Sequence, residues 1–158
     1  MEKLKIYEDS TNYTCQVIRL PTKMPVKGLD NLVEVNYQGN SCLVGKDSPE
    51  DELYLFFPAE SQICHDFLSC NSLYRHSELN VDQTKTGFFE DNRRVKAIKF
   101  RGVISSGFVI PLESLSSTLK PNGSYIKGLQ EGDSFNEVGG YELCRKFIRP
   151  RNKQPTGN

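Results

Sequence analysis

Five basic residues stand close together, with no acidic residue among them: Arg93, Arg94, Lys96, Lys99 and Arg101. A β-strand places alternate side chains on opposite faces, so Lys99 and Arg101 would share one face. Ile98 and Phe100 would then lie on the other, core-facing side. Cations along one face can contact the phosphates of a nucleic acid. The same pattern is typical of a solvated strand face that discourages edge pairing, and the spacing leaves both interpretations open.

Aromatic residues precede this basic segment in the sequence. They are Tyr74, Phe88 and Phe89, and Arg75 and His76 follow directly after Tyr74. Exposed aromatic rings beside guanidinium groups stack on unpaired bases, which contributes about 1–3 kcal/mol per base. Large aromatic residues are core residues by default, however. For Phe88 and Phe89 we therefore favour the interpretation that they fill the mouth of a barrel.

One segment has the spacing of a nucleotidyltransferase motif. In Lys120-Pro121-Asn122-Gly123 the Lys-x-x-Gly order matches enzymes whose lysine amine attacks a nucleotide phosphate. Here the four residues form a proline- and glycine-rich stretch, which is typical of a turn. Such a site also needs carboxylates and further lysines, and we expect too few residues after Gly123 to supply them. We predict a surface turn and no catalytic residue.

Cysteine and histidine could in principle hold zinc. The chain has five cysteines: Cys15, Cys42, Cys64, Cys70 and Cys144. Cys64, His65, Cys70 and His76 are ligand types that zinc accepts, but their spacing matches no common finger. We therefore expect no metal site, and reduced thiols that are mostly small core residues. Neither histidine has an obvious serine or cysteine partner for catalysis.

The composition is that of one soluble globular domain. The 158 residues are 37% hydrophobic and 25% charged, and twenty basic residues balance twenty acidic ones. Any contact with nucleic acid therefore has to be local. No apolar run approaches the roughly 20 residues that cross a bilayer. The first residues lack the apolar segment of a signal peptide. We expect a cytoplasmic protein without a membrane partner.

Short extended segments are expected to position these residues. The stretches rich in β-forming residues are 13–20, 31–37, 41–46, 52–57, 94–104, 107–112, 134–138 and 141–148. Turn signals at 38–40, 105–107 and 139–140 predict hairpins between neighbouring stretches. A four-residue apolar spacing predicts one helix over about residues 60–70. The order predicts an all-β fold with one short helix, an OB-fold-like small barrel with an added C-terminal hairpin. This domain would span residues 1–148, with a basic linker or tail at 149–158.

Three parts of the sequence resemble a known family. Residues 74–80, 87–102 and 111–112 are similar to the N-terminal OB-fold domain of ATP-dependent RNA ligases known from Deinococcus, Naegleria and large phages. Residues 132–137 and 144–147 resemble the end of that domain. The resemblance covers about residues 10–148, and residues 87–102 are its most specific part.

The resemblance implies a role in sealing RNA ends, in which this module positions nicked or broken RNA. It also implies ATP, a divalent metal and a lysyl-AMP intermediate in the nucleotidyltransferase domain that follows in the family. Lys120 precedes residues 132–147, so it does not match the nucleotidylated lysine of these ligases. We therefore expect that domain to lie outside this chain, and we expect the chain alone to be non-catalytic and to bind no cofactor.

The RNA-binding residues expected from this reasoning are the basic segment and its aromatic neighbours. They are Tyr74, Arg75, His76, Phe88, Phe89, Arg93, Arg94, Lys96, Lys99 and Arg101. The resemblance does not separate contact with single-stranded or nicked RNA from contact with the nucleotidyltransferase domain. Two alternatives therefore stay open: a protein-interaction barrel that docks that domain or another acidic partner, and a self-contained enzyme that adenylylates Lys120.

Overall fold

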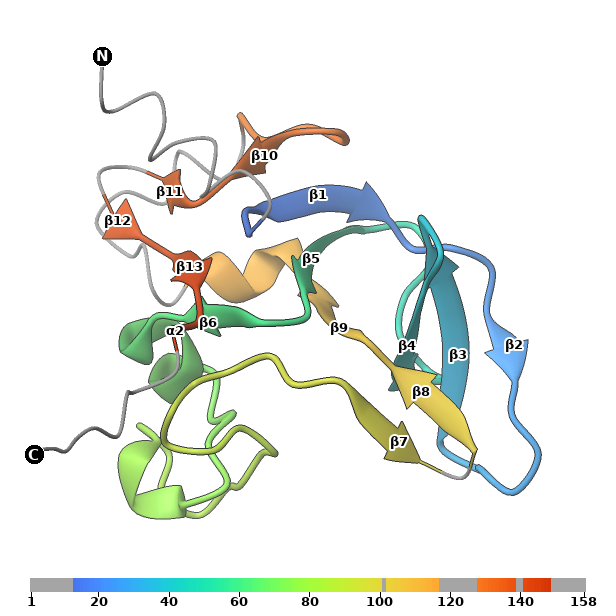
Figure 1. Ribbon diagram of the computed structural model, residues 1–158, viewed down its shortest axis with the longest axis horizontal. Helices are drawn as coiled ribbons and strands as arrows, with labels where there is room; N and C mark the ends of the chain where they lie inside the picture. Colours follow the sequence, from blue (N-terminus) through green and yellow to red (C-terminus); the bar gives the residue numbers. More distant parts are fainter. Residues whose placement is uncertain (1–12, 101, 117–127, 139–140, 149–158) are drawn as a thin grey trace, which may run out of the picture.

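A computed structural model describes residues 13–100, 102–116, 128–138 and 141–148 of the chain (Figure 1). Antiparallel strands dominate these ranges. They are accompanied by one α-helix, α2 (His65–Cys70), and by the short 3-10 helices η1 (Ser77–Leu79) and η2 (Leu112–Leu115). The predicted fold class, a β-rich and barrel-like fold with one short helix, is confirmed.

The strands are short, and several contain only two or three residues. In chain order they are β1 (Cys15–Arg19), β2 (Met24–Pro25), β3 (Leu32–Tyr37), β4 (Asn40–Gly45), β5 (Leu53–Pro58), β6 (Ser61–Ile63), β7 (Ile98–Phe100), β8 (Val103–Ser105), β9 (Gly107–Pro111), β10 (Ser134–Phe135), β11 (Glu137–Val138), β12 (Tyr141–Glu142) and β13 (Cys144–Lys146).

The central sheet has the strand order β10-β1-β5-β9. Its middle strand β5 is buried on both faces because its side chains alternate between two apolar clusters. Tyr54 and Phe56 belong to one cluster, whereas Leu55 and Phe57 belong to the other. A run of apolar residues without polar alternation is what a strand covered on both sides requires.

The three-stranded sheet β2-β3-β4 covers one face of this central sheet. Val35, Cys42 and Val44 pack there against Tyr54 and Phe56. The β3–β4 hairpin turns where the sequence predicts it, at residues 38–39, both of which have positive φ angles (52° and 83°). These angles fit the right-handed twist of the flanking strands.

Strand β4 also reaches the connection between β8 and β9, which gives the fold its barrel-like closure. The Ser106 backbone N–H donates to the Ser41 carbonyl at 2.8 Å. The Leu43 N–H donates to the Ser105 hydroxyl at 3.3 Å. Glycine is required at the start of β9, because a Cβ on Gly107 would lie only 2.6 Å from a ring carbon of Phe56.

The opposite face of the central sheet carries the larger cluster. Helix α2 places Phe67 and Leu68 there, and neither side chain is accessible to solvent. Leu143, Cys144 and Val95 complete this side from the C-terminal strands and from the segment before β7. Figure 1 shows α2 beside β6 and β13, at the other end of the molecule from the β7–β8 ribbon.

Two sequence predictions are wrong in their details. The predicted helix 60–70 begins only at His65, because residues 61–63 form β6 and pair with β13. The predicted strand 94–104 is instead the hairpin β7–β8, with Gly102 at φ +85° in its turn. Strand β9 therefore pairs with β5 and not with 94–104. Pairing across the chain decides both cases, which local sequence preference does not reveal.

Strands β1, β3, β4, β5 and β9 lie where the sequence predicts them. Strand β2 is not predicted, and the predicted stretches 134–138 and 141–148 are each divided into two short strands. Strand β11 pairs with β12 across residues 139–140, which lie outside the described residues. None of the five cysteines, which all lie within the described ranges, forms a disulfide bond, as expected for reduced thiols. Lys120, Arg101 and residues 149–158 lie outside the described residues. Within the described ranges, no helix combines the length and apolar character that crossing a membrane requires.

Candidate nucleic-acid interface

The basic segment 93–101 follows two elements in succession. Its first residues run beside β6: the Ile63 N–H donates to the Arg93 carbonyl at 3.0 Å, and the Val95 N–H donates to the Ser61 carbonyl at 2.8 Å. Val95 points into the core and is only 3% exposed. The chain then leaves β6 and enters β7 at Ile98. The predicted single basic strand is therefore divided between two surfaces.

The first surface contains a hollow of about 330 Å³ beside the β7–β8 ribbon. Its lining comes from β3, β4, the ribbon, the segment before β7, the start of β9 and the loop before residue 90. The lining residues are Leu32, Leu43, Phe88, Val95, Lys96, Ile98, Ser105, Gly107 and Phe108. The walls are mostly apolar, and Lys96 is the one cation among the lining residues. Such a site suits a ligand that has a flat, uncharged ring next to an anionic group.

Phe88 is the most exposed aromatic side chain in this hollow, with 56% of its surface accessible. Its ring stacks on Phe89 with 4.8 Å between centroids, and it meets the edge of Phe108 at 5.5 Å. Phe89 and Phe108 in turn pack edge to face at 5.0 Å. The exposed ring is therefore supported by a rigid aromatic cluster, so it loses little conformational entropy when a ligand stacks on it.

The loop that carries Phe88 is organised by one buried amide. Asn80, which is 3% exposed, accepts a hydrogen bond from the Tyr74 N–H and donates to the carbonyls of Tyr74 and Lys85. Gly87 closes the loop by donating to the Tyr74 carbonyl at 2.7 Å. A Cβ at Gly87 would lie 2.3 Å from the Leu73 carbonyl oxygen, so this position also requires glycine. The stretch that reads as irregular in sequence is thus fixed in place.

Two of the predicted aromatic residues are buried. Phe89 is 1% exposed and Tyr74 is 2% exposed. The Tyr74 hydroxyl lies 2.9 Å from His65 Nδ1, and burial raises the pKa of Tyr74 above its ordinary value. Phe89 therefore fills the core, as favoured from the sequence, whereas its neighbour Phe88 remains open to solvent.

Two predicted polar residues, Arg75 and His76, contact acidic side chains within the loop. Arg75 Nη1 lies 2.9 Å from a Glu90 carboxylate oxygen, and His76 Nδ1 lies 2.9 Å from Asp91. All four side chains are well exposed to solvent. Exposed contacts of this kind contribute little to stability, so they leave both side chains available to an anionic ligand.

The β7–β8 ribbon presents different side chains on its two faces. Ile98 faces the hollow and is 40% exposed, so the face that we expected to be buried is open. Lys99 stands opposite Ile104 in the ladder, and both side chains are exposed on the outer face. The predicted alternation along this strand is confirmed for Ile98 and Lys99.

The second surface lies on β6, β13 and the segment beside them. Arg94 is opposite Gln62 in an isolated bridge, and Gln62 is opposite Arg145 in the β6–β13 ladder, so these three residues form one row across β13, β6 and the segment beside β6. Arg94 is held by Glu60, whereas Arg145 Nε donates to the Gln62 amide oxygen at 3.0 Å. Gln62 and Arg145 were not among the predicted site residues. Only the long-range pairing of β6 with β13 brings them together, and no sequence signal indicates it.

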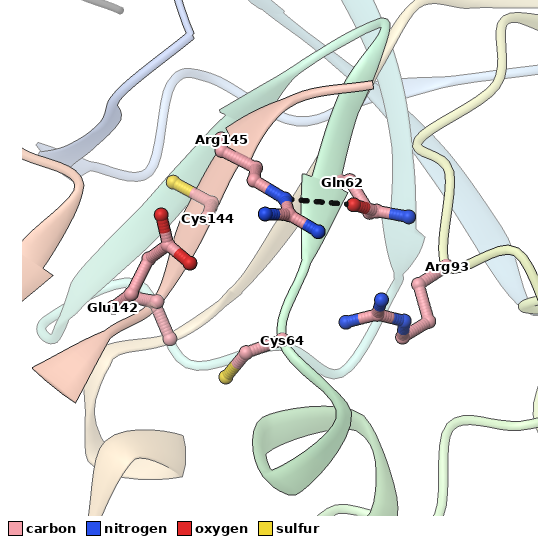
Figure 2. A pocket seen from close by; sticks show the side chains of 7 residues that line it. Gln62, Cys64, Arg93, Glu142, Cys144 and Arg145 are labelled. Atoms are coloured by element: carbon pink, nitrogen blue, oxygen red, sulfur yellow. Dashed lines mark hydrogen bonds between the residues drawn. The ribbon is translucent and has the colours of Figure 1, made fainter. Parts of the chain in front are cut away.

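Figure 2 shows a small pocket of about 40 Å³ on this second surface. Arg93 and Arg145 approach the same stretch of β6 from opposite sides, and Arg145 reaches toward Gln62. Arg93 Nη1 donates to the Ile63 carbonyl at 3.3 Å. The described part of the chain gives neither arginine a carboxylate within 4.0 Å, although Glu142 also lines the pocket.

The residues considered for zinc are engaged elsewhere. His65 contacts the Tyr74 hydroxyl, and His76 contacts Asp91. In the described ranges, no three histidine, cysteine, aspartate or glutamate side chains lie together in a way that could hold a metal ion.

No protein-family model and no curated protein matches the chain. Among solved structures, the fold is similar to part of an RNA ligase from Naegleria gruberi. A variant of that ligase without ligand matches with a TM-score of 0.56 and 18% identity, over 90% of this chain and 36% of that chain. A variant with ATP and manganese matches with a TM-score of 0.54 and 16% identity, over 89% of this chain and 37% of that chain.

A third variant, also with ATP and manganese, matches with a TM-score of 0.54 and 17% identity, over 88% of this chain and 36% of that chain. At these identities the likeness establishes a shared fold. The chain spans a little over a third of the length of these ligases. The expected similarity to an RNA ligase is thus confirmed at the level of the fold.

Proposed function

We propose that this chain is an RNA-binding module of an RNA repair ligase, which positions RNA ends and does not seal them by itself. The observation that carries the proposal is the exposed Phe88 ring, held rigidly beside an apolar hollow whose rim carries Lys96. Stacking on an aromatic ring together with nearby cations is the usual way in which proteins hold single-stranded nucleic acid.

The proposal includes an OB-fold for the domain, with residues 149–158 as a basic linker or tail. The similarity to an RNA ligase in fold supports it, as does the fraction of those ligases that the chain covers. ATP, the divalent metal and the nucleophilic lysine would then belong to a nucleotidyltransferase domain, either in a longer form of this chain or in a separate one. We also propose a cytoplasmic location, where RNA repair takes place.

A second function is favoured by one specific observation. Ile98 and Ile104 are large apolar side chains on the β7–β8 ribbon, and they are 40% and 58% exposed. Large exposed apolar residues, here one on each face of the ribbon, often mark a protein interface. The ribbon could therefore dock a nucleotidyltransferase domain rather than RNA, and the experiment has to separate the two.

The test measures fluorescence anisotropy of a labelled single-stranded RNA titrated with the chain. We expect weak binding whose affinity falls steeply as salt rises. Phe88→Ala should weaken binding about fivefold to a hundredfold, which corresponds to the loss of one stacked base. Val81→Ala is the matched control, because Val81 is an apolar residue of the same loop and is 72% exposed.

Three results would count against the proposal. The first is absent or salt-independent RNA binding by the unaltered chain. The second is an equal loss for the Phe88 and Val81 variants, which would point to a general effect on the loop. The third is capture of a nucleotidyltransferase domain by a chain that does not bind RNA, which would favour the protein-docking function.

The self-contained enzyme is tested separately. Incubation with radiolabelled ATP and magnesium would leave a covalent adenylyl group on Lys120 if that residue were the nucleophile. We expect no labelled protein, because the proposal assigns nucleotidyl transfer to another domain. A labelled band that disappears in Lys120→Ala would overturn the non-catalytic assignment.

A further inference from the structure

We infer that Arg93 and Arg145 together hold one phosphate of a bound RNA strand, with Gln62 positioned between them. This inference rests on the proposed function and adds a second contact point to it. The first contact point is the Phe88 hollow, and the second lies on β6 and β13. Residues 95–98 connect the two.

The geometry of the three side chains carries the inference. Figure 2 shows the two guanidinium groups reaching toward β6 from the flanking segments on either side of it. Each is anchored by one hydrogen bond to the protein: Arg93 to the Ile63 carbonyl at 3.3 Å, and Arg145 to Gln62 at 3.0 Å. These single bonds fix the orientation of each group while leaving further N–H donors of each guanidinium for a ligand.

The backbone explains why Arg93 reaches this pocket. Arg93 has a φ angle of +63°, which is uncommon for a residue with a side chain. Its N–H donates to the Glu90 carbonyl at 3.0 Å, and its carbonyl accepts from Ile63. A tight turn therefore precedes the pairing with β6 and directs the arginine toward Cys64 and Gln62. Unusual backbone angles that the surrounding contacts enforce are found preferentially at functional sites.

The charge at the pocket also fits an anion. Arg93, Arg145 and Glu142 are the ionised side chains that line it, so the positive charges exceed the negative one. The neighbouring Arg94 differs from them, because its charge is neutralised by Glu60. Two arginines without carboxylate partners in the described ranges are suited to a phosphate group, because guanidinium donors match its oxygen geometry.

The test compares the salt dependence of RNA affinity in Arg93→Gln, Arg145→Gln and the double variant. Each phosphate contact with a single strand contributes about 0.7 to the slope of log affinity against log salt. If both arginines share one phosphate, the double variant should lose about 0.7 in total, and each single variant should lose less than this because the remaining arginine still contacts the phosphate. A loss of about 1.4 in the double variant would mean separate phosphates and would overturn the shared contact.

Two further variants sharpen the result. Lys146→Gln removes a charge from the residue that follows Arg145. The Lys146 ammonium lies over the Tyr13 ring, 5.7 Å from its centroid, and away from the pocket. We expect Lys146→Gln to leave the slope unchanged. Glu142→Gln removes the carboxylate at the pocket, so it should increase RNA affinity at low salt. An unchanged or weakened affinity in Glu142→Gln would contradict the inference.

The outcomes separate this inference from the proposed function. RNA binding that depends on Phe88 but not on the two arginines overturns the phosphate contact alone, whereas absence of RNA binding removes both. A titration with inorganic phosphate, followed by NMR at Gln62 and Arg145, tests a free anion as the ligand. We expect only millimolar effects, and saturation at micromolar phosphate would overturn the assignment to RNA. Thermal unfolding of each variant confirms that it is folded.

Discussion

Arg94 and Glu60 form a bidentate ion pair on the surface of β6. Arg94 Nε lies 3.1 Å from both carboxylate oxygens of Glu60, and Nη2 lies 2.6 Å from one of them. The guanidinium also lies over the Phe147 ring, 5.4 Å from its centroid. The Glu60 backbone contacts the segments on either side of it, since its N–H donates to the Val95 carbonyl and its carbonyl accepts from the Phe147 N–H. The pair thus connects β6 with the segments on either side of it.

This relationship predicts that Arg94→Ala mainly lowers stability. The Arg94 side chain is only 19% exposed, so its loss should reduce the free energy of unfolding by about 1–2 kcal/mol. Urea denaturation measures this change. Arg75→Ala is the control, because its pair with Glu90 is exposed and should contribute less than about 0.5 kcal/mol.

We also expect RNA affinity to fall less in Arg94→Ala than in Lys96→Gln. The reverse order would assign Arg94 to the interface.

The β3–β4 hairpin illustrates what the sequence predicts well. Alternating apolar residues surround a Gln38-Gly39 turn, and both the strand ends and the turn appear where expected. The signal is local, because the period of the strand and the conformation of the turn depend only on neighbouring residues. Strand β5 was equally visible as a continuous apolar run.

Strand β6 illustrates what the sequence does not predict. Ile63 has an apolar partner four residues later, which predicts a helical position, yet its N–H donates to the Arg93 carbonyl 30 residues away. Pairing between distant segments overrides local preference. For the same reason the sequence predicts one strand for the basic segment and does not indicate that Arg145 lies near Arg93.

The buried amide of Asn80 gives a second prediction. Asn80→Ala removes three hydrogen bonds inside the loop that carries Phe88. Since it leaves the buried backbone groups of Tyr74 and the part-buried carbonyl of Lys85 without this partner, we expect a loss of about 2–3 kcal/mol of unfolding free energy. Chemical denaturation measures it. Hydrogen exchange should also become faster at the Tyr74 amide, which donates directly to Asn80.

Gln83→Ala is the matched control for this prediction. Gln83 is an exposed amide side chain of the same loop, so its removal should change stability by less than about 0.5 kcal/mol. If the loop positions Phe88 for stacking, Asn80→Ala should also weaken RNA binding, whereas Gln83→Ala should not. Equal stability of the two variants would show that the loop does not depend on the Asn80 hydrogen bonds.

The close approach of β9 to Phe56 gives a third prediction. A methyl group added by Gly107→Ala would lie 2.6 Å from a ring carbon of Phe56 and 3.2 Å from the Cys42 sulfur. Phe56 is only 3% exposed and has little room to move. We expect a loss of about 1–3 kcal/mol of unfolding free energy, measured by urea denaturation.

Gly45→Ala provides the comparison for Gly107. Its added Cβ would meet only the Ser48 hydroxyl, at 3.6 Å, which is an ordinary contact distance. We expect its stability to stay within about 0.5 kcal/mol of the unaltered chain. A Gly107→Ala variant as stable as Gly45→Ala would mean that β9 does not approach Phe56 so closely in solution.

The buried thiol of Cys42 gives a fourth prediction, which concerns pH. Burial raises the pKa of Cys42 from an ordinary value of 9.0 to about 12. Above pH 9 the unfolded thiol therefore loses its proton while the folded thiol keeps it. This ionisation lowers the free energy of the unfolded state and so favours unfolding. Stability from this group is complete below pH 9 and is lost as the pH rises toward 12, at up to about 1.4 kcal/mol per pH unit.

The comparison that isolates this effect is Cys42→Val, which keeps the apolar packing and removes the thiol. Urea denaturation at pH 8 and pH 10 gives the change in unfolding free energy for each protein. Other groups with raised pKa values, such as Cys15 and Tyr54, are present in both proteins and cancel. The unaltered chain should lose more stability between the two pH values than Cys42→Val. Equal losses would show that Cys42 ionises as readily in the folded chain as in the unfolded one. That result would contradict the burial of Cys42 between β4 and β5.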